Sequence, residues 1–226
     1  MGSTSILVCF AVKEEAAALQ LDPNSALPVE PLITGIGRAN ADKAVHRALE
    51  RSNPSLVLTC GFAGGLDPKL KIGDVLFDAD TDTDLDGTLR SLGAVPATFH
   101  CADRVAVTVK EKAALRRTTG ADAVEMESAV IRALCRDRRI PSATIRVISD
   151  TADKDLPLDF NSLMGADGNI SMRKLAGALV KSPGKVPRLL ELQRDTRFAA
   201  GRLAEVLHGL LRTIGGGGNS GGSRAD

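Results

Sequence analysis

The acidic residues Glu125 and Glu127 have a spacing that suits the binding of a sugar. Residues i and i+2 of an extended segment lie on one side, so both carboxylates would face one way and Met126 the other. A carboxylate accepts two hydrogen bonds in parallel, as the adjacent hydroxyls of a ribose require. The pair is equally typical of a helix N-terminus, where acidic side chains interact favourably with the dipole. Both interpretations stay open at this point.

Asp150 ends a second group of interest, because Ser149 and Asp150 directly follow an apolar run. An apolar setting keeps a carboxylic acid protonated, so Asp150 could act as a general acid. A helix cap is the ordinary use of a Ser-Asp pair and is the alternative.

Two glycine-rich segments also follow apolar runs. Residues 61–65 hold three glycines, which would let the backbone approach a sugar or an anion without a Cβ clash; a purely structural turn is the alternative. Residues 35–40 do not match a dinucleotide-binding fingerprint, because the sixth position is Asn40 and the segment does not directly follow the first strand. We expect a turn there that brings backbone N–H groups near a ligand.

Predicted strands and helices alternate along the chain, and this alternation would gather these groups. The predicted strands are residues 6–12, 55–59, 104–109 and 143–148. The predicted helices are residues 14–19, 39–51, 110–117, 128–136 and 174–211, the last interrupted at 182–184. Such alternation predicts an α/β fold with a mostly parallel sheet covered on both faces. Ligands of such sheets bind beyond the carboxyl ends of the strands, where all the groups above lie.

The remaining segments predict the domain limits. Residues 78–86 are strongly acidic and are expected to form a solvated loop. Residues 1–213 are expected to form one domain, and residues 214–226, rich in Gly and Ser, a disordered tail.

Composition excludes several classes of protein. The chain has 226 residues, 43% of them hydrophobic, and a formal net charge of +1, without the clustered basic face of a nucleic-acid-binding protein. Six Phe with no Trp or Tyr argue against base stacking on single strands. No apolar run approaches the roughly 20 residues of a membrane span, and no signal peptide is apparent, so a cytoplasmic protein is expected. The cysteines lack metal-site spacing and are expected to be buried thiols: Cys9, Cys60, Cys101 and Cys135.

Six short motifs, in this order, resemble the nucleoside phosphorylase/nucleosidase superfamily, and especially the methylthioadenosine/S-adenosylhomocysteine nucleosidases. The motifs are AVKEE (11–15), TGIG (34–37), GFAGGL (61–66), KIGD (71–74), AVEME (123–127) and IRVISDTAD (145–153). The resemblance implies a single three-layer α/β/α domain with a mixed, mostly parallel central sheet, and a homodimer. It also implies cleavage of the N-glycosidic bond of a small purine nucleoside, adenosine-like, without a cofactor.

The resemblance also implies roles for individual residues. Asp150 matches the acid that protonates the purine at N7, and Glu15 matches the base that activates the attacking water. Glu127 matches the carboxylate that holds the ribose hydroxyls, with Met126 packing on the sugar. The other implied substrate contacts are Glu125, Gly61, Phe62, Ala63, Gly64, Val105, Ala106, Ser149 and Phe160. Arg146, inside its strand, is expected to be structural.

Several positions depart from the nucleosidases. The chain between residues 74 and 121 is shorter, Val105 stands where they stack an aromatic side chain, and Phe62 replaces a small polar residue. The chain after Phe160 instead resembles the hopanoid-associated phosphorylase branch, which is linked to a bulky apolar 5′ substituent, although Glu15 departs from that branch.

The nucleophile therefore stays open between water and inorganic phosphate as a co-substrate. Phosphate would need cationic or backbone donors, for which Gly37, Arg38 and Arg104 are the candidates. A nucleoside-binding protein without catalysis is the alternative that the missing aromatic residue suggests. The retention of Glu15, Glu127 and Asp150 speaks against it.

Overall fold

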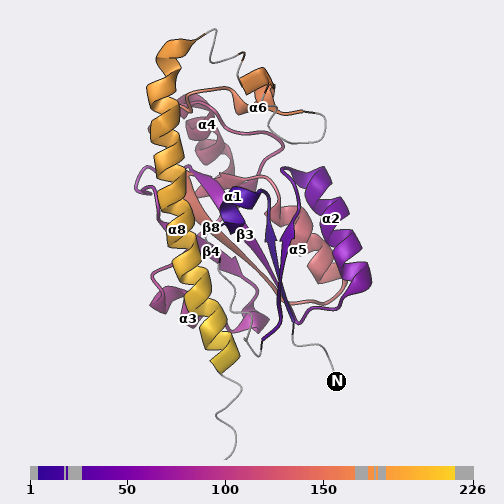
Figure 1. The fold of residues 1–226 in the computed structure, drawn as a ribbon. Helices are drawn as coiled ribbons and strands as arrows, with labels where there is room; N and C mark the ends of the chain where they lie inside the picture. The colour runs from indigo at the N-terminus through magenta and orange to yellow at the C-terminus, as the bar shows by residue number, and fades with distance from the viewer. Residues whose placement is uncertain are drawn as a thin grey trace, which may run out of the picture.

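A central sheet of eight strands organises the computed structural model, which describes residues 5–17, 19, 27–165, 173–175, 177 and 182–216 (Figure 1). The strands are β1 (Ile6–Phe10), β2 (Val29–Ile33), β3 (Leu56–Gly65), β4 (Val75–Ala79), β5 (Val95–Pro96), β6 (Phe99–Cys101), β7 (Ala123–Glu125) and β8 (Ser142–Asp150). The helices are α1 (Lys13–Ala16), α2 (Arg38–Arg51), α3 (Asp86–Ser91), α4 (Val109–Thr119), α5 (Ser128–Asp137), α6 (Phe160–Leu163) and α8 (Val186–Gly216). Two 3₁₀ turns, η1 (Thr81–Thr83) and η2 (Pro183–Lys185), complete the elements.

The sheet is mixed and mostly parallel, as predicted. Its order is β2-β1-β3-β8-β4-β5, and the pairs from β2 to β8 are all parallel. β4 runs antiparallel to β8, and β7 pairs antiparallel with the end of β3 and parallel with β6. β3 and β8 therefore lie side by side at the centre and end at the same edge.

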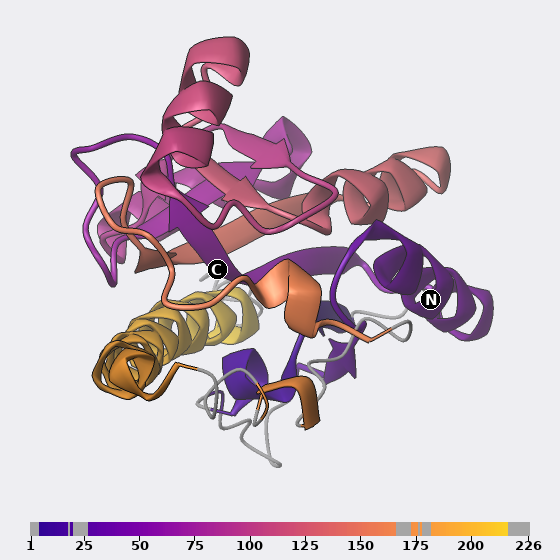
Figure 2. The ribbon, with the colours of Figure 1, turned by 90° about the horizontal axis from the view of Figure 1, so that it is seen from above.

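Apolar side chains divide between the two faces of the sheet, because successive strand residues point in opposite directions. On one face, Leu58 of β3 belongs to the same buried cluster as Leu203 of α8. On the other face, Val57 clusters with Val45 of α2 and Ile131 of α5. Figure 2 shows α8 on one side of the sheet and α4 and α5 on the other. The predicted three-layer arrangement is confirmed.

The glycine-rich segment 61–65 is part of a strand, so the alternative of a purely structural turn is wrong. β3 continues through Gly65 because β8 runs beside it, with Gly61 opposite Arg146 and Gly64 opposite Asp150. The register shifts between Ala63 and Gly64, which marks an irregularity in the pairing. The lack of side chains at the glycines leaves room at the strand end that carries the site.

The acidic segment 78–86 is only partly the solvated loop that was expected: Asp82, Asp84 and Asp86 are exposed, but the segment includes the end of β4 and the turn η1. Asp78 lies near the end of β4, and both Asp78 and Asp80 form ion pairs with Arg132 of α5. Asp80 also accepts hydrogen bonds from the backbone N (3.0 Å) and Oγ (2.8 Å) of Ser142. The local acidity gave no sign of an arginine from a distant helix.

The strand predicted at residues 104–109 is also wrong. The strand lies earlier, at β6, and the chain then runs irregularly until α4 begins at Val109. Thr108 and Glu111 form a capping box, with Thr108 Oγ1 accepting from Glu111 N at 3.2 Å. This cap ends the extended run and starts the helix.

The C-terminal helix extends further than predicted. α8 runs to Gly216, so residues 214–216 are helical rather than part of the tail, while residues 217–226 lie outside the described part of the chain. None of the helices in the described ranges has the length and apolar character of a membrane span. All four cysteines are buried and free.

Candidate active site

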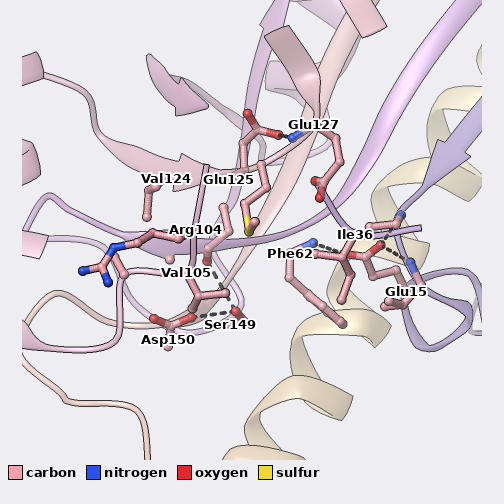
Figure 3. A pocket seen from close by; sticks show the side chains of 16 residues that line it. Glu15, Ile36, Phe62, Arg104, Val105, Val124, Glu125, Glu127, Ser149 and Asp150 are labelled. Carbon is pink, nitrogen blue, oxygen red and sulfur yellow. Dashed lines mark hydrogen bonds between the residues drawn. The ribbon is translucent and has the colours of Figure 1, made fainter. Parts of the chain in front are cut away.

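A cavity of about 180 Å³ opens where β3 and β8 end (Figure 3). Most of the predicted site residues line it: Glu15, Phe62, Ala63, Gly64, Arg104, Val105, Ala106, Glu125, Met126, Glu127, Ser149 and Asp150. Ala11, Val12, Ile36 and Val124 also line it. Figure 3 shows Ser149 and Asp150 at one end and Glu15 and Glu127 at the other. The structure thus brings together groups that are far apart in the sequence.

Glu15 lies in the short helix α1 and is held by backbone groups. Its Oε2 accepts hydrogen bonds from the N atoms of Ala11 (2.7 Å) and Val12 (3.1 Å), and Oε1 accepts one from Phe62 N (2.8 Å). Burial raises the pKa of Glu15 from 4.5 to about 7, against the opposing effects of Arg146 and of the Phe62 hydrogen bond. A carboxyl with such a pKa can take up a proton near neutral pH.

Gly61 does not line the cavity but makes this arrangement sterically feasible. A Cβ at this position would meet Glu15 Oε1 and would lie 2.6 Å from Nη1 of Arg146. Only a residue without a side chain lets β3 pass between the two groups.

Arg146, which was expected to be structural, is buried beside the carboxylates of the site and does not line the cavity. Its Nη2 donates to Oε2 of Glu125 (2.7 Å), Oε2 of Glu127 (3.3 Å) and Oγ1 of Thr59 (3.2 Å). Burial disfavours the charged guanidinium, but Glu125, Glu127 and Glu15 outweigh it and raise the pKa of Arg146. A charged residue within the apolar run 145–148 is a sequence signal for buried carboxylates nearby, because a buried charge needs a partner.

Glu125 and Glu127 differ in how their oxygens are used. Glu125 accepts hydrogen bonds from Glu127 N (2.9 Å), Ser128 N (2.7 Å) and Ser128 Oγ (2.7 Å) at the start of α5. Burial would raise the pKa of Glu125, but Arg146 and the Ser128 hydrogen bonds outweigh it and hold it below its usual value. The helix N-terminus interpretation therefore describes Glu125.

Glu127 keeps acceptor capacity toward the cavity. Its Oε1 accepts from Gly37 N at 2.8 Å, and its Oε2 accepts from Nη2 of Arg146 at the longer distance of 3.3 Å. Burial raises the pKa of Glu127, against the opposing charge of Arg146. Each oxygen retains a lone pair for a further donor, so Glu127 rather than Glu125 fits the predicted binding of a diol.

Asp150 does not have the apolar setting that was predicted. Its Oδ2 lies 2.6 Å from Nζ of Lys112, and its Oδ1 accepts a hydrogen bond from Ser149 Oγ at 2.9 Å. The run before Asp150 is apolar, but the side chain that faces its carboxyl group, Lys112, comes from α4. Nothing in the sequence around Lys112 distinguishes it from the solvated lysines of an ordinary helix surface.

Four of the predicted site residues do not line the cavity. These four candidates are Gly37, Arg38, Gly61 and Phe160. Arg38 donates to Cys101 O and pairs with Asp103 at 3.2 Å.

Arg104 lines the cavity but forms an ion pair with Glu111. The loop that carries Arg104 and Val105 is fastened to α6 by Asn161. The side chain of Asn161 accepts from Val105 N at 2.8 Å and donates to Val105 O at 3.0 Å.

This geometry can supply acid and base at the two ends of one ligand. An acid at Asp150 could protonate a leaving group, and Glu15 could take a proton from a nucleophile at the opposite end. Glu127 lies at the same end as Glu15 and could stabilise positive charge that develops on the ligand.

Comparison with known proteins gives a consistent result. The model of the Phosphorylase superfamily matches residues 31–93 and 76–181. The 5'-methylthioadenosine/S-adenosylhomocysteine nucleosidases of Glaesserella parasuis and Marinomonas sp. are 29% identical over 166 residues and 30% identical over 168 residues. Each of these alignments covers 59% of this chain and 72% of the relative.

Solved structures share the fold at low sequence identity. Futalosine hydrolase of Helicobacter pylori superposes with a TM-score of 0.67 at 16% identity, covering 93% of this chain and 98% of that chain. The nucleosidase of the same organism, solved with butyl-thio-DADMe-Immucillin-A, gives the same TM-score, identity and coverage.

Proposed function

Because the chain belongs to the phosphorylase superfamily, we propose that it is an enzyme that cleaves the N-glycosidic bond of a purine nucleoside. The observation that carries the proposal is the placement of Asp150 opposite Glu15 and Glu127 in one cavity. The relatives are named for adenosine derivatives, so we propose an adenosine-like substrate. The homodimer stays a prediction.

In the proposed reaction, the ribose hydroxyls bind to Glu127 and the purine lies toward Asp150. Asp150 takes up a proton from solvent and gives it to N7 of the base, the C–N bond breaks, and the electron pair of that bond leaves with the base. The ribose acquires oxocarbenium character, which the carboxylate of Glu127 stabilises. Glu15 takes a proton from the nucleophile as it attacks the sugar carbon.

We propose water as the nucleophile rather than phosphate. The carboxyl groups of Glu15, Glu125 and Glu127 lie around the buried guanidinium of Arg146. Such a concentration of carboxyl groups disfavours a phosphate anion. The three candidate phosphate ligands have other partners: Gly37 N donates to Glu127, Arg38 is bound to Cys101 and Asp103, and Arg104 to Glu111.

The identity of the sugar product tests this proposal. With 5'-methylthioadenosine or adenosine as substrate, we expect adenine and the free sugar at equal rates with and without added phosphate. Mass spectrometry of the sugar decides between the reactions. A ribose 1-phosphate that forms only with phosphate would establish phosphorolysis, and the absence of any product would favour a nucleoside-binding protein.

Glu127→Gln tests the recognition of the diol. Glutamine has one acceptor oxygen and no charge, so it holds two adjacent hydroxyls less well. A lost charge-assisted hydrogen bond costs about 1.5–3 kcal/mol, so kcat/KM on a riboside should fall roughly 10- to 150-fold. The matched 2′-deoxyriboside should lose less, because it already lacks one of the two hydroxyls. An equal loss on both substrates would contradict the assignment.

A further inference from the structure

Lys112 is a fully buried ammonium group next to the proposed acid, and the reaction described above does not use it. It lies in α4 and is the buried residue of that helix. Its side chain has 0% exposure, and Nζ lies 2.6 Å from Oδ2 of Asp150. A buried lysine is costly unless its charge is paired and its hydrogen bonds are made.

All three donors of the ammonium have acceptors. Besides Asp150 Oδ2, Nζ donates to the carbonyl oxygens of Thr151 (2.6 Å) and Lys154 (3.1 Å). An ammonium has three N–H bonds, so these three contacts fix its direction. Lys112 therefore ties the end of β8 and the following turn to α4, with Asp150 at the point where they meet.

We propose that Lys112 is a positioning residue for the general acid Asp150, an inference that rests on the proposed function. Because Lys112 donates to Oδ2, the proton that Asp150 takes up from solvent before the reaction, and then transfers, lies on Oδ1. Ser149 Oγ donates a hydrogen bond to Oδ1 at 2.9 Å. This contact uses one lone pair of Oδ1 and leaves the other for the proton. The orientation of the carboxyl group is thus set from both sides.

The same contact stabilises the charge that the reaction creates. When the O–H bond of Asp150 breaks and the N7–H bond of the base forms, Asp150 becomes a carboxylate. Lys112 keeps its own protons throughout and lies against that new negative charge, in a position shielded from water. Lys112 does not line the cavity, so it acts through Asp150 and not on the substrate.

A comparison of leaving groups tests the proposal. Lys112→Met should lower kcat on adenosine by about 10-fold or more, out of the roughly 10²–10⁴-fold that a positioned acid contributes, with KM nearly unchanged. On 4-nitrophenyl β-D-ribofuranoside the leaving group departs without protonation, so kcat should change less than about 2-fold. Lys110→Met, an exposed lysine of the same helix, is the matched control and should behave as wild type.

A double-mutant cycle keeps the test decisive. Asp150→Asn and the pair Lys112→Met/Asp150→Asn should have the same activity on adenosine, because a residue that acts through Asp150 has no effect once the acid is absent. Lys112→Gln, which keeps an N–H donor without the charge, replaces Lys112→Met if that variant does not fold. Equal losses on the two substrates, or a further loss in the pair, would overturn the proposal. Full activity of Asp150→Asn alone would instead refute Asp150 as the acid of the proposed function.

Discussion

Glu15→Gln is expected to lower kcat by roughly 10²- to 10⁴-fold, the contribution of a well-placed acid–base group. Glutamine has nearly the same shape as glutamate but takes up no proton, so the attacking water is no longer activated. Release of adenine from adenosine, followed by absorbance or chromatography, measures the loss. Glu14→Gln is the matched control, because Glu14 is the neighbouring carboxylate in α1 and is exposed. Normal turnover by Glu15→Gln would contradict the assignment.

The pH dependence of the wild type gives a second test of Glu15. A base must be ionised to act, and the pKa of Glu15 is about 7, so kcat/KM should rise with pH through about 7. Stability should change in the opposite direction. A carboxyl whose pKa is raised by folding favours the folded state below its unfolded value near 4.5, and this contribution is lost as the pH rises through about 7. Denaturation midpoints from pH 4.5 to 8 should fall in the wild type and less so in Glu15→Gln.

Asp150→Asn is expected to reduce kcat on adenosine by a similar factor, roughly 10²- to 10⁴-fold. Asparagine keeps the size of the side chain and an acceptor for Lys112, but it has no proton to give to the base. Asp153→Asn changes an exposed carboxylate three residues later and should retain wild-type activity.

A thermal melt of Asp150→Asn must accompany the assay, because the variant leaves the buried ammonium of Lys112 without its counter-charge. A folded variant with wild-type turnover would remove Asp150 from the mechanism.

The gathering of Glu15, Glu127 and Asp150 could be predicted from two general rules. Short apolar runs predict buried strands, and parallel strands bring their carboxyl ends to one edge of a sheet. Both rules depend only on residue type and order. The two runs before Cys60 and Ser149 became the neighbouring strands β3 and β8, and the site lies where these strands end.

The partners that act between layers could not be predicted in this way. Lys112 belongs to a helix whose local sequence is ordinary, and only the packing of α4 against the end of β8 brings it to Asp150. The glycine segment left a turn open as an alternative, because its pairing partner, β8, is distant in the sequence. The local sequence pattern predicts whether a segment is a helix or a strand. It does not predict which side chains of other elements pack against it.

The position of β8 in the sheet has a consequence for the synthesis of this protein. β8 lies between β3 and β4, although it is the final strand along the described chain. On the ribosome, β1, β2 and β3 emerge first, and the edge of β3 that β8 covers stays unpaired until residues 142–150 have left the exit tunnel. That edge belongs to an apolar strand, and unpaired edges of this kind readily pair with other chains. A nascent chain is therefore prone to aggregation at this stage, when chaperones can bind it. A truncated chain without β8 also lacks Asp150 of the site.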